Sequence, residues 1–202
     1  MAEKLSIAVI MGSTREGRLC EAVTNWVTTE LAKLDELNLT VIDPLDLTST
    51  APLDNLVLDG IRAELGAADA FIVVTPEYNH SFPAPLKALI DAVNNEWHTK
   101  PVGFVSYGGV SGGLRAVEQL RQVFVELQSA SVRDSVSFIN AWEQFDDNGS
   151  LKDQDRPRRT LMRMLEQLNW WGRALKQARL EDVRKRQLSH RGAALRLACQ
   201  TG

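Results

Sequence analysis

The stretch Ile7-Ala8-Val9-Ile10-Met11, followed at once by Gly12-Ser13-Thr14-Arg15-Glu16-Gly17-Arg18, decides the fold. An uninterrupted apolar run that ends at a glycine is typical of a strand buried on both faces of a parallel sheet. Apolar residues then recur at three- and four-residue steps, which predicts an amphipathic helix; they are Leu19, Val23, Trp26, Val27, Leu31 and Leu34. The chain therefore begins with a strand, a glycine turn and a helix.

The same βα unit recurs along the chain. Further strands are predicted at residues 39–42, 71–74, 102–105 and 132–139, and the last alternates with polar residues as an edge strand does. Helices are predicted at residues 56–67, 86–93, 114–127 and 157–178. Because parallel strands need right-handed crossovers, we expect an α/β fold: a three-layer, doubly wound, five-stranded parallel sheet with the flavodoxin-like order 2-1-3-4-5.

Composition limits the class of protein. A chain of 202 residues with 44% hydrophobic and 24% charged residues suits one globular domain. Its apolar runs are too short to span a bilayer, and its first residues lack the basic start of a secretory signal, so we expect a cytoplasmic protein without a membrane partner. Cys20 and Cys199 form no C-x-x-C pair, which argues against a disulfide framework or a metal site.

The charge is uneven along the chain. Residues 1–151 hold 10 Lys and Arg against 21 Asp and Glu, whereas residues 152–202 hold 13 against 5. A basic segment can bind nucleic acid, or it can be the solvated face of a long helix on an acidic body. Nucleic acid is the less favoured partner, because no aromatic residues alternate with the bases Arg179, Arg184, Lys185, Arg186, Arg191 and Arg196.

Ligands of doubly wound sheets bind outside the carboxyl ends of the strands. The first loop there, residues 12–18, opens a helix, whose free N–H groups and dipole attract a phosphate, and Arg15 and Arg18 add donors. It lacks the lysine of a nucleotide-triphosphate loop and a third glycine at Thr14, so a monophosphate fits better. An ordinary capped turn with solvated arginines is the alternative.

Two more loops share this edge. The second, residues 75–87, combines three prolines with Tyr78, a rigid arrangement that can lie against a flat heterocycle. The third, residues 106–113, holds four glycines, which let backbone approach a ligand closely. The simpler interpretation of the second loop is that Tyr78 fills an apolar gap. The simpler interpretation of the third loop is a tight turn into the next helix.

The sequences Gly12-Ser13-Thr14-Arg15, Thr75-Pro76-Glu77-Tyr78-Asn79, Pro85-Leu86-Lys87 and Ser106-Tyr107-Gly108-Gly109, with Gly112-Gly113, resemble those of the NADPH-dependent FMN reductase family. This flavodoxin-like group includes quinone, azo and chromate reductases. The resemblance covers about residues 5–178. We therefore expect a flavodoxin-like FMN-binding domain at 1–178 and a basic helical extension or tail at 179–202.

The resemblance implies FMN as cofactor and NADPH or NADH as reductant. It implies that Ser13, Arg15 and Arg18 hold the phosphate, and it places Cys20 at a further cofactor position. Cys20 has two interpretations: a thiol of lowered pKa at a helix start, or a buried packing residue. The remaining cofactor contacts that the resemblance implies are Pro76, Glu77, Tyr78, Asn79, Ser106, Tyr107, Gly108, Gly109 and Gly112.

The expected activity is hydride transfer from NAD(P)H to FMN and then to a small-molecule acceptor: a quinone, free flavin, azo compound or metal ion. No side chain is expected to be catalytic, because the flavin carries the reaction. The resemblance also implies a homodimer or homotetramer. The alternative is a flavin-binding electron-transfer or redox-sensing protein without useful NAD(P)H activity.

Overall fold

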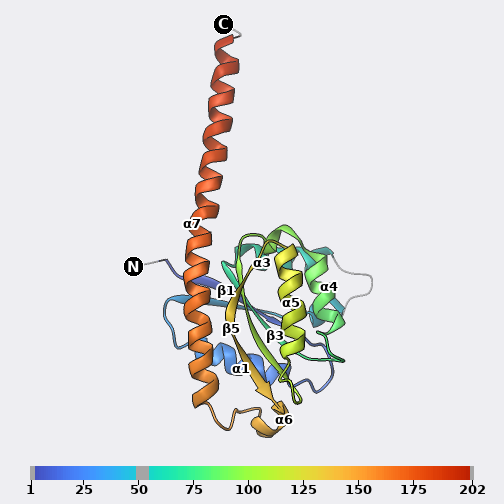
Figure 1. The fold of residues 1–202 in the computed structure, drawn as a ribbon. Coiled ribbons are helices and arrows are strands. Elements are labelled where there is room, and N and C mark those ends of the chain that lie inside the picture. The colour runs from blue at the N-terminus through green and yellow to red at the C-terminus, as the bar shows by residue number, and fades with distance from the viewer. Residues whose placement is uncertain (1–2, 49–54, 201–202) are drawn as a thin grey trace.

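The computed structural model describes residues 3–48 and 55–200, and for residues 186–200 it describes the backbone alone. Five parallel strands form one sheet in the order β2-β1-β3-β4-β5 (Figure 1), which confirms the predicted fold. The strands are β1 (Leu5–Met11), β2 (Leu37–Ile42), β3 (Ala70–Pro76), β4 (Pro101–Gly108) and β5 (Ala130–Ile139).

All five predicted helices are present. They are α1 (Cys20–Leu31), α3 (Asn55–Ala67), α4 (Ala84–Ala92), α5 (Leu114–Glu126) and α7 (Asp155–Gln200). The short helices α2 (Leu45–Thr48) and α6 (Ala141–Gln144) and the 3₁₀ turn η1 (Asn95–Trp97) were not predicted, because elements of three or four residues show no apolar period. Helix α1 ends at Leu31, so Leu34 lies beyond it.

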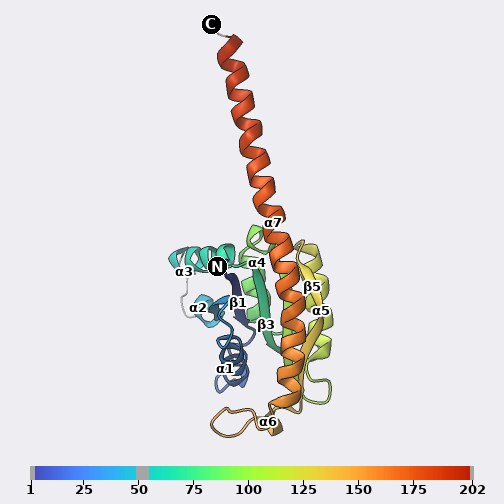
Figure 2. The ribbon, with the colours of Figure 1, turned by 90° about the vertical axis from the view of Figure 1, so that its left-hand side faces the viewer.

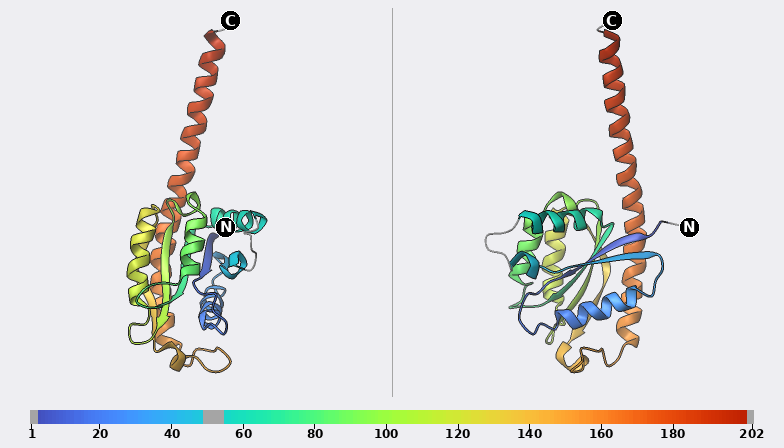
Figure 3. Two further views of the ribbon diagram at one scale, coloured as in Figure 1. Left: turned by 90° about the vertical axis from the view of Figure 1, so that its right-hand side faces the viewer. Right: turned by 180° about the vertical axis from the view of Figure 1, so that it is seen from behind.

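The helices cover both faces of the sheet and create two apolar cores. Helices α1 and α7 pack on one face, and α3, α4 and α5 pack on the other (Figures 1 and 3). Successive residues of β1 point alternately to the two cores: Val9 joins the first and Ile10 the second, and neither is exposed. Burial of such a side chain contributes about 1.5–3 kcal/mol, which explains the continuous apolar runs.

The outer edge of β5 is covered by side chains. The N–H groups of Arg133 and Asp134 donate to Oε1 of Gln167 at 3.0 and 3.2 Å. The Arg121 guanidinium donates to the carbonyl oxygens of Val132 and Arg133 at 2.7 and 3.0 Å. β5 is the last strand in the sheet order, so it is an edge strand, as predicted. The contacts occupy backbone groups at this edge that would otherwise be free to pair with another strand.

Helix α7 extends beyond the body of the protein. Its first half buries Leu161, Met164 and Leu168 in the first core, whereas farther along Leu180 is 44% and Val183 is 52% exposed. Figures 1 and 2 show the second half projecting away from the sheet. Helix α7 continues past residue 178, so the predicted end there is wrong. Burial stops near this residue, but no proline or glycine follows it before Gly192, and α7 includes Gly192 as well.

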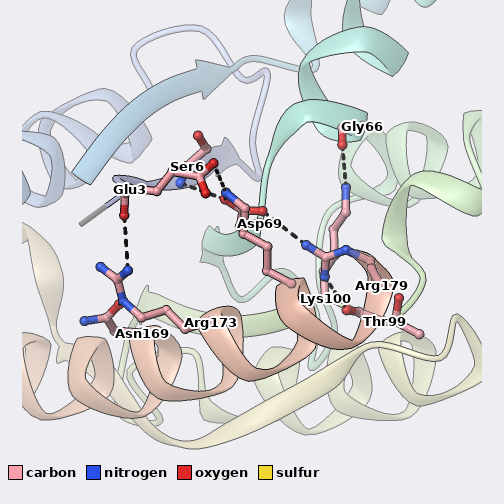
Figure 4. Close-up of polar contacts among 10 residues, drawn as sticks. Glu3, Ser6, Gly66, Asp69, Thr99, Lys100, Asn169, Arg173 and Arg179 are labelled. Atoms are coloured by element: carbon pink, nitrogen blue, oxygen red, sulfur yellow. Dashed lines mark hydrogen bonds and ion pairs between the residues drawn. The ribbon is translucent and has the colours of Figure 1, made fainter. Parts of the chain in front are cut away.

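A polar cluster anchors α7 where it leaves the sheet (Figure 4). The Asp69 side chain, 8% exposed, accepts hydrogen bonds from Lys176 at 2.9 Å, Arg179 at 3.1 Å and the backbone N–H of Ser6 at 3.2 Å. Arg179 also donates to the carbonyl oxygen of Thr99 at 2.6 Å. Ser6, Asp69 and Thr99 all lie near the amino ends of strands, so α7 projects from the edge opposite the three glycine- and proline-rich loops.

Within residues 3–48 and 55–200, no helix combines the length and apolar character needed to cross a membrane. The structure does not describe the side chains of Arg186, Arg191 and Arg196. These three bases belong to the less favoured nucleic-acid surface.

We predict that deletion of residues 180–202 leaves the free energy of unfolding nearly unchanged, because Arg179 and its contacts remain. Deletion after Leu175 should instead lower it by about 1–3 kcal/mol, because Asp69 loses both cations while it stays buried. Urea denaturation of both truncated proteins measures the difference. Equal stability of the two would contradict the anchoring role of Asp69.

Candidate functional site

The first loop crosses closely over the end of β3. The N–H of Gly12 donates to the carbonyl oxygen of Val74 at 2.7 Å. A Cβ atom at position 12 would lie 2.8 Å from that oxygen and 3.0 Å from Cα of Thr75. Such contacts are too short for any side chain, so glycine at this position allows the loop to pass.

The first and second loops are joined by a hydrogen bond. Oγ of Ser13 lies 2.9 Å from the Tyr78 hydroxyl and accepts from the N–H of Arg15 at 3.3 Å. Ser13 is fully buried. The predicted site residues Ser13 and Tyr78 are therefore brought together, although 65 positions separate them.

The two arginines of the first loop differ in their surroundings. Arg15 is exposed, and its guanidinium has no ion pair within the described part of the chain. The Arg18 side chain is 6% exposed; it pairs with both oxygens of Asp43 and also donates to the Ser13 carbonyl oxygen. With its bond to Glu21, four of its five N–H donors are used, and the Asp43 carboxylate raises the Arg18 pKa.

Arg18 therefore braces the loop, and Arg15 is the guanidinium left free for an anion.

Cys20 lies inside the protein, in contact with the backbone of the first loop. It is fully buried in the core with Val23, and its Sγ lies 3.6 Å from the carbonyl oxygen of Val74. Burial raises the thiol pKa, and hydrogen bonds from Tyr107 and the loop backbone only partly oppose this effect. Of the two interpretations of Cys20, the packing residue agrees with its burial and raised pKa, and its role as a cofactor contact stays a prediction.

The second loop contains a tight turn. Tyr78 and Ser81 exchange backbone hydrogen bonds of 2.9 and 3.0 Å, and the two residues between them, Asn79 and His80, have φ of 49° and 72°. Positive φ at both central positions is typical of a type I′ turn, which asparagine tolerates well. Gln119 of α5 holds the turn by donating to the His80 carbonyl oxygen at 2.8 Å. Asn79 is therefore presented on an exposed, well-supported turn.

The third loop has an inward and an outward part. Oγ of Ser106 donates to the Gly112 carbonyl oxygen at 2.8 Å, and both Ser106 and Gly112 are buried. Gly113, at φ 85°, leaves no room for a Cβ atom, which would lie 2.7 Å from Cβ of Ser106. Tyr107 is 6% exposed. Among the predicted site residues of this loop, Gly108 and Gly109 alone are partly open to solvent, so these two are the ones that a ligand can reach.

Glu77 joins the second and third loops. Its carboxylate accepts from the Ser111 hydroxyl at 2.7 Å and from the N–H and guanidinium of Arg115 at 3.2 and 2.8 Å. Burial alone would raise the Glu77 pKa, but the bonds from Ser111 and Arg115 outweigh it, and the pKa is lowered. Pro76 beside it is buried as the last residue of β3. Glu77 therefore positions the loops, a role that sequence could not show because Arg115 lies 38 positions away.

A hollow of about 830 Å³ opens beside the first loop, between α1 and residues 146–154. Its lining includes the acidic side chains of Glu21, Asp146 and Asp147, which would repel a phosphate. The face of the loop that carries Arg15 is therefore the better place for an anion. Within the described residues, no group of His, Cys, Asp or Glu could hold a metal ion.

Residues 5–143 match the family model described as NADPH-dependent FMN reductase. The chain belongs to the NADPH-dependent FMN reductase family. As a member it is an oxidoreductase with FMN as cofactor and NAD(P)H as reductant.

Relatives of this FMN reductase chain carry consistent names. An NAD(P)H-dependent FMN reductase of Schizosaccharomyces pombe is 37% identical over 58% of this chain and 64% of its own. An NAD(P)H:quinone oxidoreductase of Solanum tuberosum is 32% identical over 77% of this chain and 87% of its own. A quinone reductase of Pseudomonas putida is 31% identical over 78% and 90%.

Solved structures confirm the fold. The flavoenzyme NAD(P)H:acceptor oxidoreductase of Paracoccus denitrificans matches with a TM-score of 0.66 and 20% identity, over 84% of this chain and 98% of its own. A flavodoxin of Streptococcus pneumoniae matches with a TM-score of 0.53 and 19% identity, over 82% and 97%. At this identity the likeness shows the flavodoxin-like fold alone.

The residues of the first loop fit a flavin mononucleotide. The backbone N–H groups of Thr14, Glu16 and Gly17 have no acceptor within the described residues, and Arg15 stands beside them. Free N–H groups before a helix, together with one unpaired guanidinium, are suited to a phosphate dianion.

We predict that Arg15→Ala weakens FMN binding by about 10- to 150-fold, the equivalent of one charge-assisted hydrogen bond, and leaves riboflavin binding nearly unchanged. Its thermal stability should stay at the wild-type level because Arg15 is exposed. Arg18→Ala is the matched variant: it should lose about 1–3 kcal/mol of stability because Asp43 loses its partner. Fluorescence titration and thermal denaturation measure both effects, and an equal loss for FMN and riboflavin in Arg15→Ala would contradict the phosphate contact.

We also predict a pH effect from Glu77. Because its pKa is lower in the folded protein, ionised Glu77 stabilises the fold above its unfolded pKa of about 4.3, and this contribution is lost as pH falls through the folded value. Wild type should therefore be more stable than Glu77→Gln at pH 7, and the difference should shrink towards pH 3. Thermal denaturation of both proteins from pH 3 to 7 measures this. A constant difference over that range would contradict the role of the charge.

Proposed function

We propose that the chain is an FMN-dependent NAD(P)H oxidoreductase that passes reducing equivalents to a small-molecule acceptor, with a quinone as the favoured class. The observation that carries the proposal is the arrangement of three interlocked loops at one sheet edge, with Arg15, Asn79, Gly108 and Gly109 on its accessible side. The names of the potato and Pseudomonas relatives support quinones as acceptors. Free flavin, azo compounds and metal ions are further acceptors within the same proposal.

Each site residue has one of two roles in this proposal. Arg15 and the N–H groups of the first loop bind the phosphate, while Asn79, Gly108 and Gly109 border the ring system. The remaining residues hold the loops in place: Ser13, Arg18, Pro76, Glu77, Tyr78, Ser106, Tyr107 and Gly112. This second group determines how well the site is formed before the cofactor binds.

The reaction chemistry comes from the cofactor, and the protein supplies its position. When bound, FMN accepts a hydride from NAD(P)H and returns two electrons to the acceptor. The chain's own residues would fix the phosphate end at Arg15, and Gly108 and Gly109 add no side chain of their own to the accessible side of the third loop. That open side lets the reductant and the acceptor enter in turn. Because the cofactor carries the hydride, no side chain has to donate or remove a proton at carbon.

Assembly and compartment belong to the same proposal. The resemblance implies a homodimer or homotetramer, the states common in the family, with the flavin near the subunit contact, and we expect one of these states. We also expect a cytoplasmic location, because a chain with two cysteines and no C-x-x-C pair suits a reducing compartment.

We predict that anaerobic mixing of the FMN-loaded protein with NADPH or NADH bleaches the flavin absorbance, and that a naphthoquinone restores it. Stopped-flow absorbance measures both halves of the cycle. A protein that stays oxidised in excess NADPH and NADH would instead support the electron-transfer or redox-sensing alternative.

A further inference from the structure

Trp142 is an exposed aromatic side chain at the site edge of the sheet. It belongs to α6, which follows directly after β5 at its carboxyl end (Figure 1). The N–H of Asn140 donates to the Gly109 carbonyl oxygen at 3.1 Å, so the start of α6 is tied to the third loop. A Cβ atom placed on Gly109 would lie 3.6 Å from Cη2 of Trp142, and the indole is 63% exposed.

The hydrophobic core does not explain this tryptophan. Its neighbours Ala141 and Phe145 are 1% and 4% exposed, and Phe145 packs edge-on against Phe138 with ring centroids 5.3 Å apart. Those residues fix α6 on the sheet. Trp142, in contrast, leaves most of its large apolar surface to solvent beside Gly109.

Trp142 is one of several exposed apolar residues around the third loop. Val110 is 87%, Ile139 is 52% and Leu114 is 48% exposed. Ile139 lies against the loop, because a Cβ atom at Gly112 would be 3.0 Å from its Cγ1. We call Val110, Leu114, Ile139 and Trp142 the apolar rim. Grouped apolar side chains at the surface are typical of a binding surface.

We propose that Trp142 is a specificity-determining residue of the oxidoreductase, which stacks on planar aromatic electron acceptors of the quinone class beside Gly109. The inference rests on the proposed function and adds the residue that selects the acceptor. An indole offers a flat apolar face to a fused aromatic ring, and it offers no comparable contact to a small inorganic oxidant. The quinone gains a hydride equivalent from the reduced cofactor and one proton from water, and it leaves as the hydroquinone.

The experiment compares two acceptors in the FMN-loaded, full-length protein. Wild type, Trp142→Ala, Trp142→Phe and Trp170→Ala are reduced with dithionite, and reoxidation by a naphthoquinone or by ferricyanide is followed by stopped flow. Trp170 is the matched control, since it is 65% exposed and belongs to α7, where it packs against Trp171. Dithionite makes this test independent of NAD(P)H, so a failure of the proposed NAD(P)H activity is seen separately.

Loss of one aromatic contact should weaken the apparent affinity for naphthoquinone by about 2- to 12-fold in Trp142→Ala. Ferricyanide reoxidation should stay unchanged. Trp142→Phe should recover most of the loss, and Trp170→Ala should match wild type. Calorimetric titration of the oxidised protein with a redox-inert naphthalene derivative should show the same weakening in Trp142→Ala.

Four outcomes would overturn the proposal. They are an unchanged naphthoquinone affinity in Trp142→Ala, an equal loss for both acceptors, loss of bound FMN, and a change in oligomeric state on size-exclusion chromatography. Loss of FMN would make Trp142 a cofactor contact. A change in oligomeric state would make the apolar rim a contact between two copies of the chain.

Discussion

The site depends on the parallel pairing of β1, β3 and β4. Because these strands run in the same direction and both faces of the sheet are covered, their three following loops must leave at one edge. Gly12 shows how close this arrangement is, since its N–H bonds directly to Val74 at the end of the neighbouring strand. The loops are therefore adjacent before any loop side chain makes a contact.

Side chains then join the loops to one another. The Ser13–Tyr78 hydrogen bond joins the first loop to the second, and the bond that the Ser111 hydroxyl donates to Glu77 joins the third loop to the second. Such cross-links lower the conformational entropy that a bound cofactor has to remove. Helix α7 projects from the opposite edge, where Asp69 anchors it, so the long basic extension and the candidate site are separated within one chain (Figures 1 and 4).

Residues of the same type have different roles at this edge. Arg15 and Arg18 are three positions apart, yet one is exposed and the other pairs with Asp43. Trp142 is exposed beside Gly109, whereas Trp97 is fully buried among Phe71 and Phe124. Partner and burial, and not residue type, decide whether such a side chain can meet a ligand.

The sequence by itself determined the strands, the strand order and the edge that carries the site, because these follow from local apolar periodicity and from turn residues in the chain. It also determined the family, through motifs that lie within single loops. Only the tertiary structure decided that Arg18 and Glu77 brace the loops, that Cys20 is buried, that α7 continues past residue 178, and that Trp142 lies beside Gly109. The physical reason is distance along the chain: Asp43 is 25 positions from Arg18, and Arg115 is 38 from Glu77, so a local pattern carries no signal of either pair.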